Sequence, residues 1–123
     1  MPDIRVVFRC SICQAAITQP VSPLKQDQAV SLEEGKAVVP KGFFAPNKKE
    51  YWTTTGSVIV NLADLVSTRR HPDFRRVNGC CGFDGCDGPN LVCRNGHEIG
   101  TKKSDCWTPH AAILVEGVVP VNA

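Results

Sequence analysis

The seven cysteines are the residues of this chain with the clearest chemical potential, and two of them have the spacing of a metal-ligand pair. Cys10 and Cys13 enclose only Ser11 and Ile12. Two thiolates at this spacing can turn toward one ion, as in a zinc knuckle, where the zinc–sulfur distance is about 2.3 Å. The pair therefore predicts a Zn2+ site.

A redox pair of the thioredoxin type is the competing interpretation of the same two cysteines. Such a pair normally opens a helix, whose N-terminus lowers the pKa of the attacking thiol. The residues after Cys13 run only to Pro20, which leaves no room for that helix. Thiol redox chemistry stays open as a secondary alternative.

A closed structural zinc site needs four ligands, so two more must come from another part of the chain. Cys80 and Cys81 are adjacent, and neighbouring side chains diverge in extended backbone, so we expect only one of them to join a given ion. Gly82 lets the backbone turn back behind Cys81, which favours Cys81. One ion or two are expected. The predicted ligands are Cys10, Cys13, Cys81 and Cys93, and the residues that could replace a member of this set are Cys80, Cys106, His97 and His110.

The position of His97 depends on the turn that precedes it. Asn95-Gly96 between two apolar stretches predicts a β-hairpin with a two-residue turn. In that register Cys93 lies opposite Glu98, and Arg94 lies opposite His97. Cys93 and His97 would then project from opposite faces of the hairpin. This geometry argues against the two residues as joint ligands.

A possible nucleophile lies near the end of the chain, where Cys106 precedes His110 by four residues. A catalytic cysteine needs a base of this kind. Pro109 disfavours the helix that would bring the two side chains together. We expect a structural thiol buried beside a buried Trp107 at the edge of the core. The sequence therefore predicts no catalytic residue and no enzymatic activity.

An acidic segment at residues 83–90 could suggest a calcium loop, since it holds Asp84, Asp87 and Asn90. Its spacing differs from that of an EF-hand, and no bidentate glutamate follows. Glycine-rich turns explain the same residues.

Length and composition bound the class of protein. The chain has 123 residues, which is enough for one domain, and its 42% hydrophobic and 21% charged residues are typical of a globular protein. No apolar run is long enough to span a membrane, and no secretory signal is apparent at the start. These features predict a cytoplasmic protein. A net charge of +2 is too small to require a polyanionic partner.

The elements that must position the cysteines are mostly strands. Apolar and polar residues alternate just before Cys10, and a short apolar run follows Gly56 and Ser57. We expect a loop over residues 14–35. The expected strands are residues 4–9, 36–44, 50–55, 58–60, 91–94, 97–99 and 111–115.

One segment has helical periodicity. Asn61 can cap a helix over Leu62–Arg70, in which Leu62, Leu65 and Val66 form an apolar stripe. The predicted fold is a β-rich α+β class, a small zinc-stapled single domain with hairpins and one short helix. This single zinc-binding domain covers residues 1–123, with an N-terminal knuckle at residues 1–20 and a cysteine-rich C-terminal half at residues 78–123.

At Cys10 and Cys13 the sequence resembles zinc-ribbon proteins, in which β-hairpins present two ligand pairs to one ion. No second Cys-x-x-Cys pair is present, which departs from the usual pattern. The stretch from Asn78 through Trp107 is similar to a motif of small bacterial cysteine-rich proteins of unassigned role. The resemblance implies a zinc-binding hairpin and carries no activity with it.

These features favour a non-enzymatic protein that acts as a binding or adaptor module for another protein. A nucleic-acid-binding zinc ribbon is the first alternative, because residues 41–79 hold seven Lys and Arg against three acids and include Tyr51 and Trp52. A thiol redox protein is the second. Neither a membrane nor a small-molecule substrate is indicated as a partner.

Overall fold

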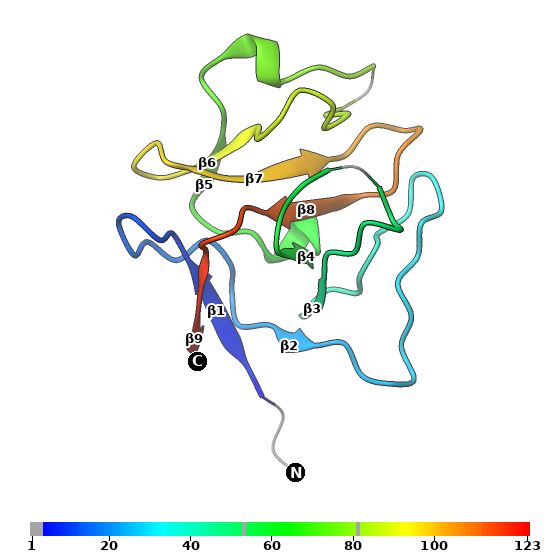
Figure 1. Cartoon of the computed structure of the whole chain (residues 1–123), viewed down its shortest axis with the longest axis vertical. Helices are drawn as coiled ribbons and strands as arrows, with labels where there is room; N and C mark the ends of the chain where they lie inside the picture. Colours follow the sequence, from blue (N-terminus) through cyan, green and yellow to red (C-terminus); the bar gives the residue numbers. More distant parts are fainter. Residues whose placement is uncertain (1–3, 53, 81) are drawn as a thin grey trace.

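The fold consists of two β-sheets in which most neighbouring strands are antiparallel. A computed structural model describes residues 4–52, 54–80 and 82–123. The larger sheet has seven strands in the order β2-β3-β4-β8-β7-β6-β5, and the smaller pairs β1 with β9. The strands are β1 Val6–Arg9, β2 Ser22–Pro23, β3 Phe43–Pro46, β4 Val58–Val60, β5 Thr68–Arg70, β6 Leu91–Cys93, β7 Glu98–Lys103, β8 Ala111–Leu114 and β9 Val119–Asn122 (Figure 1).

Strand β8 is the centre of the large sheet, with β4 on one side and β7 on the other. All four of its residues are buried. Ala112 and Leu114 face a core shared with β1, whereas Ala111 and Ile113 face a second core on the opposite side of the sheet. Burial on both faces explains why this strand is a continuous apolar run rather than an alternating one.

The small sheet covers one face of the large sheet. Val6 and Phe8 of β1 are buried in the first core, while the intervening residues are half-exposed, which is the alternation expected of a strand with one buried face. Phe8 also packs edge-on against Phe44 of β3, with ring centroids 5.1 Å apart. Strand β1 is therefore held in place by packing as well as by its pairing with β9.

The predicted α+β class with one short helix is wrong, because the described chain is nearly all β. Only one 3-10 turn, Leu62–Asp64, forms where the helix over residues 62–70 was expected, with Asn61 capping it. Leu65 then forms a β-bridge with Thr18. Residues 68–70 continue as strand β5, which pairs with β6. Pairing with distant segments thus overrides the local helical pattern.

Other expectations have mixed outcomes. The strands predicted near residues 4–9, 58–60 and 111–115 and the hairpin at residues 91–99 are confirmed. The strand predicted at residues 36–44 begins only at Phe43 and continues to Pro46, and the described residues of 50–55 form no strand. Within the described part of the chain, no helix has the length and apolar character needed to cross a bilayer.

Candidate metal centre

The first half of the site is a tight loop that follows β1. The amide of Gln14 donates to the carbonyl of Cys10, and the amide of Cys10 donates to the carbonyl of Ala15, each at 2.9 Å. Gln14 takes a left-handed conformation, with φ of 64°, which turns the chain back toward β1. These bonds close residues 10–15 into a loop that presents the thiols of Cys10 and Cys13 from one end of β1.

The second half is the loop between β6 and β7. The amide of Cys93 donates to the carbonyl of His97, and the amide of Gly96 donates to the carbonyl of Cys93, each at 2.9 Å. The turn therefore has three residues, 94–96, and ends at Gly96 with φ of 87°. A glycine at the left-handed position is typical of three-residue hairpin loops.

This turn corrects the predicted register. With three loop residues instead of two, Cys93 lies opposite His97 rather than opposite Glu98. A shift of one residue moves a side chain to the other face of a hairpin. The expectation that Cys93 and His97 face opposite sides is therefore wrong.

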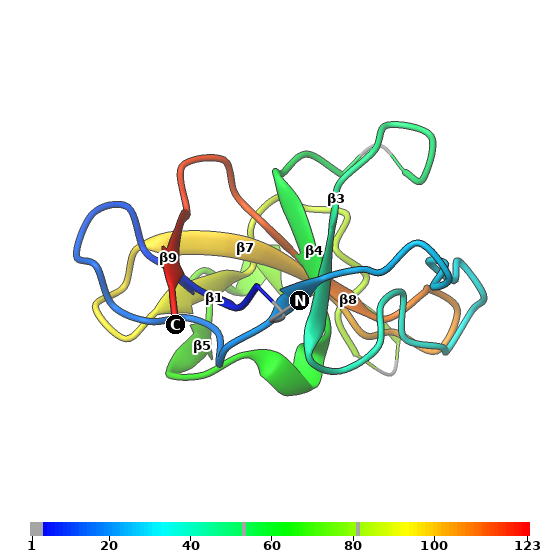
Figure 2. The same cartoon turned by 90° about the horizontal axis from the view of Figure 1, so that it is seen from below.

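The two loops bring four ligand atoms together. One atom from each of Cys10, Cys13, Cys93 and His97 lies within 4.8 Å of the others. In Figures 1 and 2 the loop after β1 and the loop between β6 and β7 lie side by side at one end of the molecule. Cys10 and Cys93 are 2% and 0% exposed, so half of the site is closed to solvent.

The distances inside this cluster fit a tetrahedral ion. Two sulfurs bound to one zinc at about 2.3 Å would stand about 3.8 Å apart, and a sulfur and an imidazole nitrogen would stand about 3.6 Å apart. The Sγ atoms of Cys13 and Cys93 are 3.7 Å apart, and Cys93 Sγ lies 3.5 Å from His97 Nδ1. The donors therefore have the spacing of two edges of a zinc tetrahedron.

Hydrogen bonds in the site favour thiolates. The side-chain amide of Asn95, followed by the backbone amide of Ala15, lowers the pKa of Cys13 to about 6. Burial opposes ionisation of Cys93, but hydrogen bonds from the amides of His97 and Asn95 leave its pKa lowered. For Cys10 burial prevails and the pKa is raised. Thiolate is the form that binds metal. The lowered pKa values of Cys13 and Cys93 therefore favour the metal-binding form of both residues.

The thiols of Cys13 and Cys93 also affect the imidazole of His97. Its hydrogen bonds with Cys13 and then Cys93 raise the pKa of its imidazole. In the metal-free protein this proton offsets part of the negative charge of the thiolates. A metal ion must displace it, because imidazole binds metal in its neutral form.

Of the four predicted ligands, three lie in the cluster. Cys10, Cys13 and Cys93 converge, whereas Cys81 lies outside the described residues. His97, which the predicted register disfavoured, takes the fourth position in the described cluster. The exposed cysteines Cys80, Cys86 and Cys106 are not members of it.

The segment around Cys106 differs from its predicted structure. The expectation of a buried thiol beside a buried tryptophan is wrong, since Cys106 is exposed and Trp107 is 51% exposed. The buried carboxylate of Asp105 organises this turn and accepts hydrogen bonds from the Trp107 indole and the Cys80 amide. His110 donates through Nε2 to the carbonyl of Asp105 at 3.0 Å.

Asn95 is a residue of the candidate site that the sequence indicated only as a turn former. Its backbone amide donates to Cys93 Sγ at 3.4 Å, and its side chain hydrogen-bonds to Cys13. One residue thus contacts a thiol from each half of the site. Its position two residues after a cysteine is the available sequence signal, because amides at that position of a turn point back toward the sulfur.

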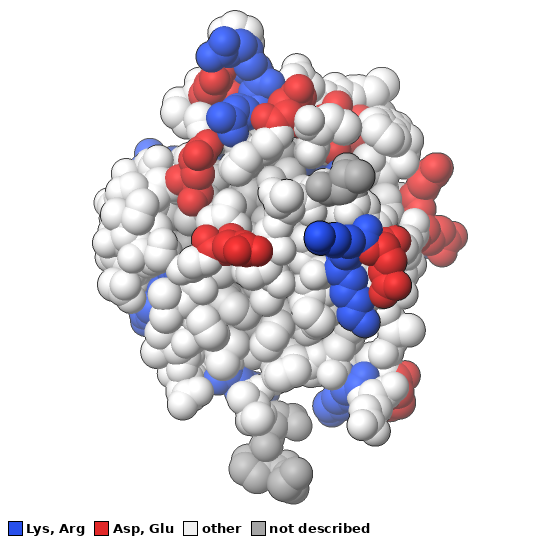
Figure 3. Space-filling view, in the orientation of Figure 1, with Lys and Arg blue, Asp and Glu red and all other residues white. Residues whose placement is uncertain are grey.

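Two of the basic residues of the middle segment form ion pairs. Arg75 pairs with Asp73, and Arg76 pairs with Glu98. In Figure 3 lysine and arginine side chains alternate with aspartate and glutamate over the segment that follows β5. On the face shown there, charges of both signs are mixed over this segment.

No protein-family model, curated protein or solved structure matches this chain.

Proposed function

We propose that the chain binds one zinc ion through Cys10, Cys13, Cys93 and His97, and that this ion is structural. The observation that supports the proposal is the agreement of two independent donor distances, 3.7 and 3.5 Å, with a tetrahedral zinc site. Three soft thiolates and one imidazole also form a common structural zinc set, and this donor set disfavours magnesium and calcium.

A structural role follows from the number of protein donors. Catalytic zinc sites keep a coordination position for water or substrate, whereas structural sites fill all four with protein atoms. This cluster supplies four, and two of its residues are buried. The proposal is therefore that the chain has no enzymatic activity at this centre.

The ion would connect segments that are distant in sequence. Cys10 and Cys13 follow β1 of the small sheet, whereas Cys93 and His97 belong to the β6–β7 hairpin of the large sheet. A link between them closes a loop of about 80 residues, and links across long loops remove much entropy from the unfolded chain. Zinc would in this way fix the small sheet onto the large one.

The wider role in this proposal is that of a protein-binding module. Two large apolar side chains, Ile12 and Phe74, are 69% and 79% exposed. Ile12 lies at the tip of the Cys10–Cys13 loop, where the metal would hold it rigid. Rigid exposed apolar residues are common anchors in protein interfaces. Ile12→Ser should keep the zinc and reduce the partner proteins recovered by crosslinking in cells.

Metal analysis tests the zinc site directly. The protein purified without added metal should contain close to one equivalent of zinc, and Co2+ exchanged into it should show the thiolate-to-metal absorption and strong visible bands of a tetrahedral site. Cys13→Ser and His97→Ala should each reduce the metal content, whereas Cys86→Ser, a matched exposed cysteine, should not. A folded protein that takes up no metal, or Cys86→Ser losing metal as readily as Cys13→Ser, would contradict the proposal.

A further inference from the structure

A cleft lies at the opposite end of β7 from the metal centre. His97 immediately precedes this strand and Lys103 ends it. A cavity of about 440 Å³ and a neighbouring one of about 320 Å³ share Trp52, Thr54 and Thr55 in their walls. The two cavities are therefore adjacent, with Trp52 in the wall that they share, and together they are called the cleft. A strand of six residues spans about 20 Å, so the cleft is separate from the metal centre.

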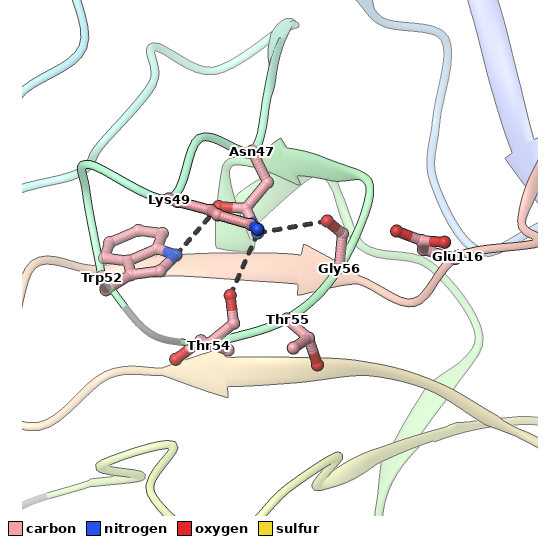
Figure 4. A pocket seen from close by; sticks show the side chains of 7 residues that line it. All are labelled: Asn47, Lys49, Trp52, Thr54, Thr55, Gly56 and Glu116. Carbon is pink, nitrogen blue, oxygen red and sulfur yellow. Dashed lines mark hydrogen bonds between the residues drawn. The ribbon is translucent and has the colours of Figure 1, made fainter.

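A hydrogen bond positions Trp52 in this cleft. Its indole Nε1 donates to Asn47 Oδ1 at 2.9 Å. The amide nitrogen of Asn47 in turn donates to the carbonyls of Thr54 and Gly56, each at 3.1 Å. Figure 4 shows these three bonds radiating from Asn47 inside the loop. An aromatic ring fixed before a ligand arrives costs little entropy when the ligand binds.

Lys103 places an ammonium group in the wall of the smaller cavity. Its side chain is largely buried, with the residue 8% exposed. The Nζ atom lies 5.5 Å from the centre of the Trp52 ring and donates to the carbonyl of Asp84 at 3.3 Å. Gly85 permits this position, because a Cβ there would lie 2.8 Å from Lys103 Cγ. The lysine is thus enclosed by an aromatic face and backbone.

No carboxylate forms an ion pair with Lys103 among the described residues. Cys86 and Asp84 are the acidic groups that act on it electrostatically. Asp84 Oδ1 accepts from the Cys86 amide, and partial desolvation together with the neighbouring Asp84 carboxylate raises the pKa of the Cys86 thiol, so this thiol is neutral near pH 7. Burial also lowers the pKa of Lys103 itself. A buried cation without a paired anion is costly, and an anion that entered the cavity would offset that cost.

The remaining groups of the cleft suit a small ligand with one anionic end. The hydroxyl-bearing residues Thr54, Thr55 and Thr101 line the smaller cavity beside Lys103. The larger cavity has one cation and one anion at its rim, Lys49 and Glu116, which come from different sides in Figure 4. Because the charges of Lys49 and Glu116 cancel, Lys103 determines that the cleft favours a negatively charged ligand.

We propose that this cleft binds a small organic anion, whose carboxylate or phosphate group pairs with Lys103 while its apolar part lies along Trp52. Aromatic and threonine side chains around one charged anchor are the usual composition of small-molecule sites. The site is independent of the zinc proposal, because no residue is shared between the two.

Titration followed by NMR tests the ligand class on the unmodified zinc-loaded protein. The probes are benzoate, its neutral counterpart benzamide, and inorganic phosphate. Benzoate should produce saturable shifts of the Trp52 indole NH and of the Gly85 and Thr101 amides, and benzamide should not. Shifts with phosphate as well would assign the site to oxyanions in general, and shifts with phosphate alone to phosphate compounds. No saturable shift with either anion, or equal shifts with benzamide, would overturn the proposal.

A pair of adjacent lysine variants tests the anchor. Lys103→Met should weaken benzoate or phosphate binding at least tenfold. Lys102→Met is the matched control, because Lys102 lies on the same strand with its Nζ 5.2 Å from the centre of the Phe83 ring. Equal affinity in parent and Lys103→Met would refute the role of Lys103. If Lys103→Met does not fold, the comparison of benzoate with benzamide on the parent protein decides the matter.

Discussion

The described cysteines fall into two regions with contrasting surroundings. At the metal centre, Cys10, Cys13 and Cys93 converge from loops that are tied to strands on both sides. In the connections that follow β5 and β7, Cys80, Cys86 and Cys106 are exposed. The β5–β6 connection, residues 71–90 with residue 81 not described, contains one 3-10 turn and no strand in its described part. Convergence of thiols therefore requires a rigid frame as well as cysteines.

The difference in stability between the two regions should be largest when the proposed metal ion is removed. Chelation should lower the free energy of unfolding by about 3 kcal/mol or more, because the ion links segments some 80 residues apart. Thermal and urea unfolding with and without chelator would measure it. Cys86→Ser should unfold within about 0.5 kcal/mol of the parent. An unchanged melting temperature after complete metal removal would show that the frame holds without the ion.

The next largest difference should be in zinc affinity, when one histidine is replaced in each region. His97→Ala should reduce zinc affinity by about 100-fold or more, since it deletes a direct ligand. His71→Ala should leave zinc affinity within about twofold, because His71 contacts Glu98 and the amide of Asp73 instead. Competition with a chromophoric chelator would measure both variants. Similar affinities for the two would mean that His97 is not a ligand.

Asparagines of the two regions offer a finer test. Asn95→Ala should reduce zinc affinity about tenfold, which is the usual effect of losing a group that orients metal ligands. Asn78→Ala removes bonds to the Arg75 carbonyl and to Asp87 and should not alter zinc binding. The same chelator competition applies. Unaltered affinity in Asn95→Ala would assign that side chain to the turn alone.

The smallest effect should come from the ion pairs of the β5–β6 connection. Glu98 accepts from Arg76 at 3.1 Å and pairs with His71 at 3.0 Å, and its side chain is 45% exposed. Glu98→Gln should lower the free energy of unfolding by about 0.5–1 kcal/mol, with less effect at high salt. Urea unfolding at two salt concentrations would show it. A larger loss, or loss of zinc, would connect this region to the metal centre.

Local patterns predicted the frame better than they predicted the site. Strands β1 and β4 and the β6–β7 hairpin follow from alternation, from an apolar run and from Asn95-Gly96. The segment 62–70 has a helical stripe, but its partners are Thr18 and β6, which no local pattern reveals. Tertiary pairing decides such segments.

The fourth member of the cluster, His97, was missed because the predicted turn was one residue too short. Asn95-Gly96 predicts a turn but does not distinguish a two-residue loop from a three-residue loop that ends at Gly96. That difference determines which residue faces Cys93. Cys10, Cys13 and Cys93 were predicted as joint ligands from residue type and spacing, but the docking of β1 onto the large sheet, which brings them together, has no local sequence signal. Cysteine type and spacing indicated a candidate metal site, and three-dimensional pairing determined which residues form the cluster.

The central place of β8 has a consequence for the order in which the protein can be made. Synthesis from the N-terminus releases β4 long before β8, its partner in the sheet, and β1 long before β9. The β6–β7 hairpin is local and can form early, whereas pairings between distant segments form slowly. A nascent chain would therefore carry Cys10 and Cys13 without Cys93 and His97, the other members of the cluster, until the hairpin emerges. Its thiols and apolar strands would be exposed to chaperones, oxidants and other nascent chains throughout that interval.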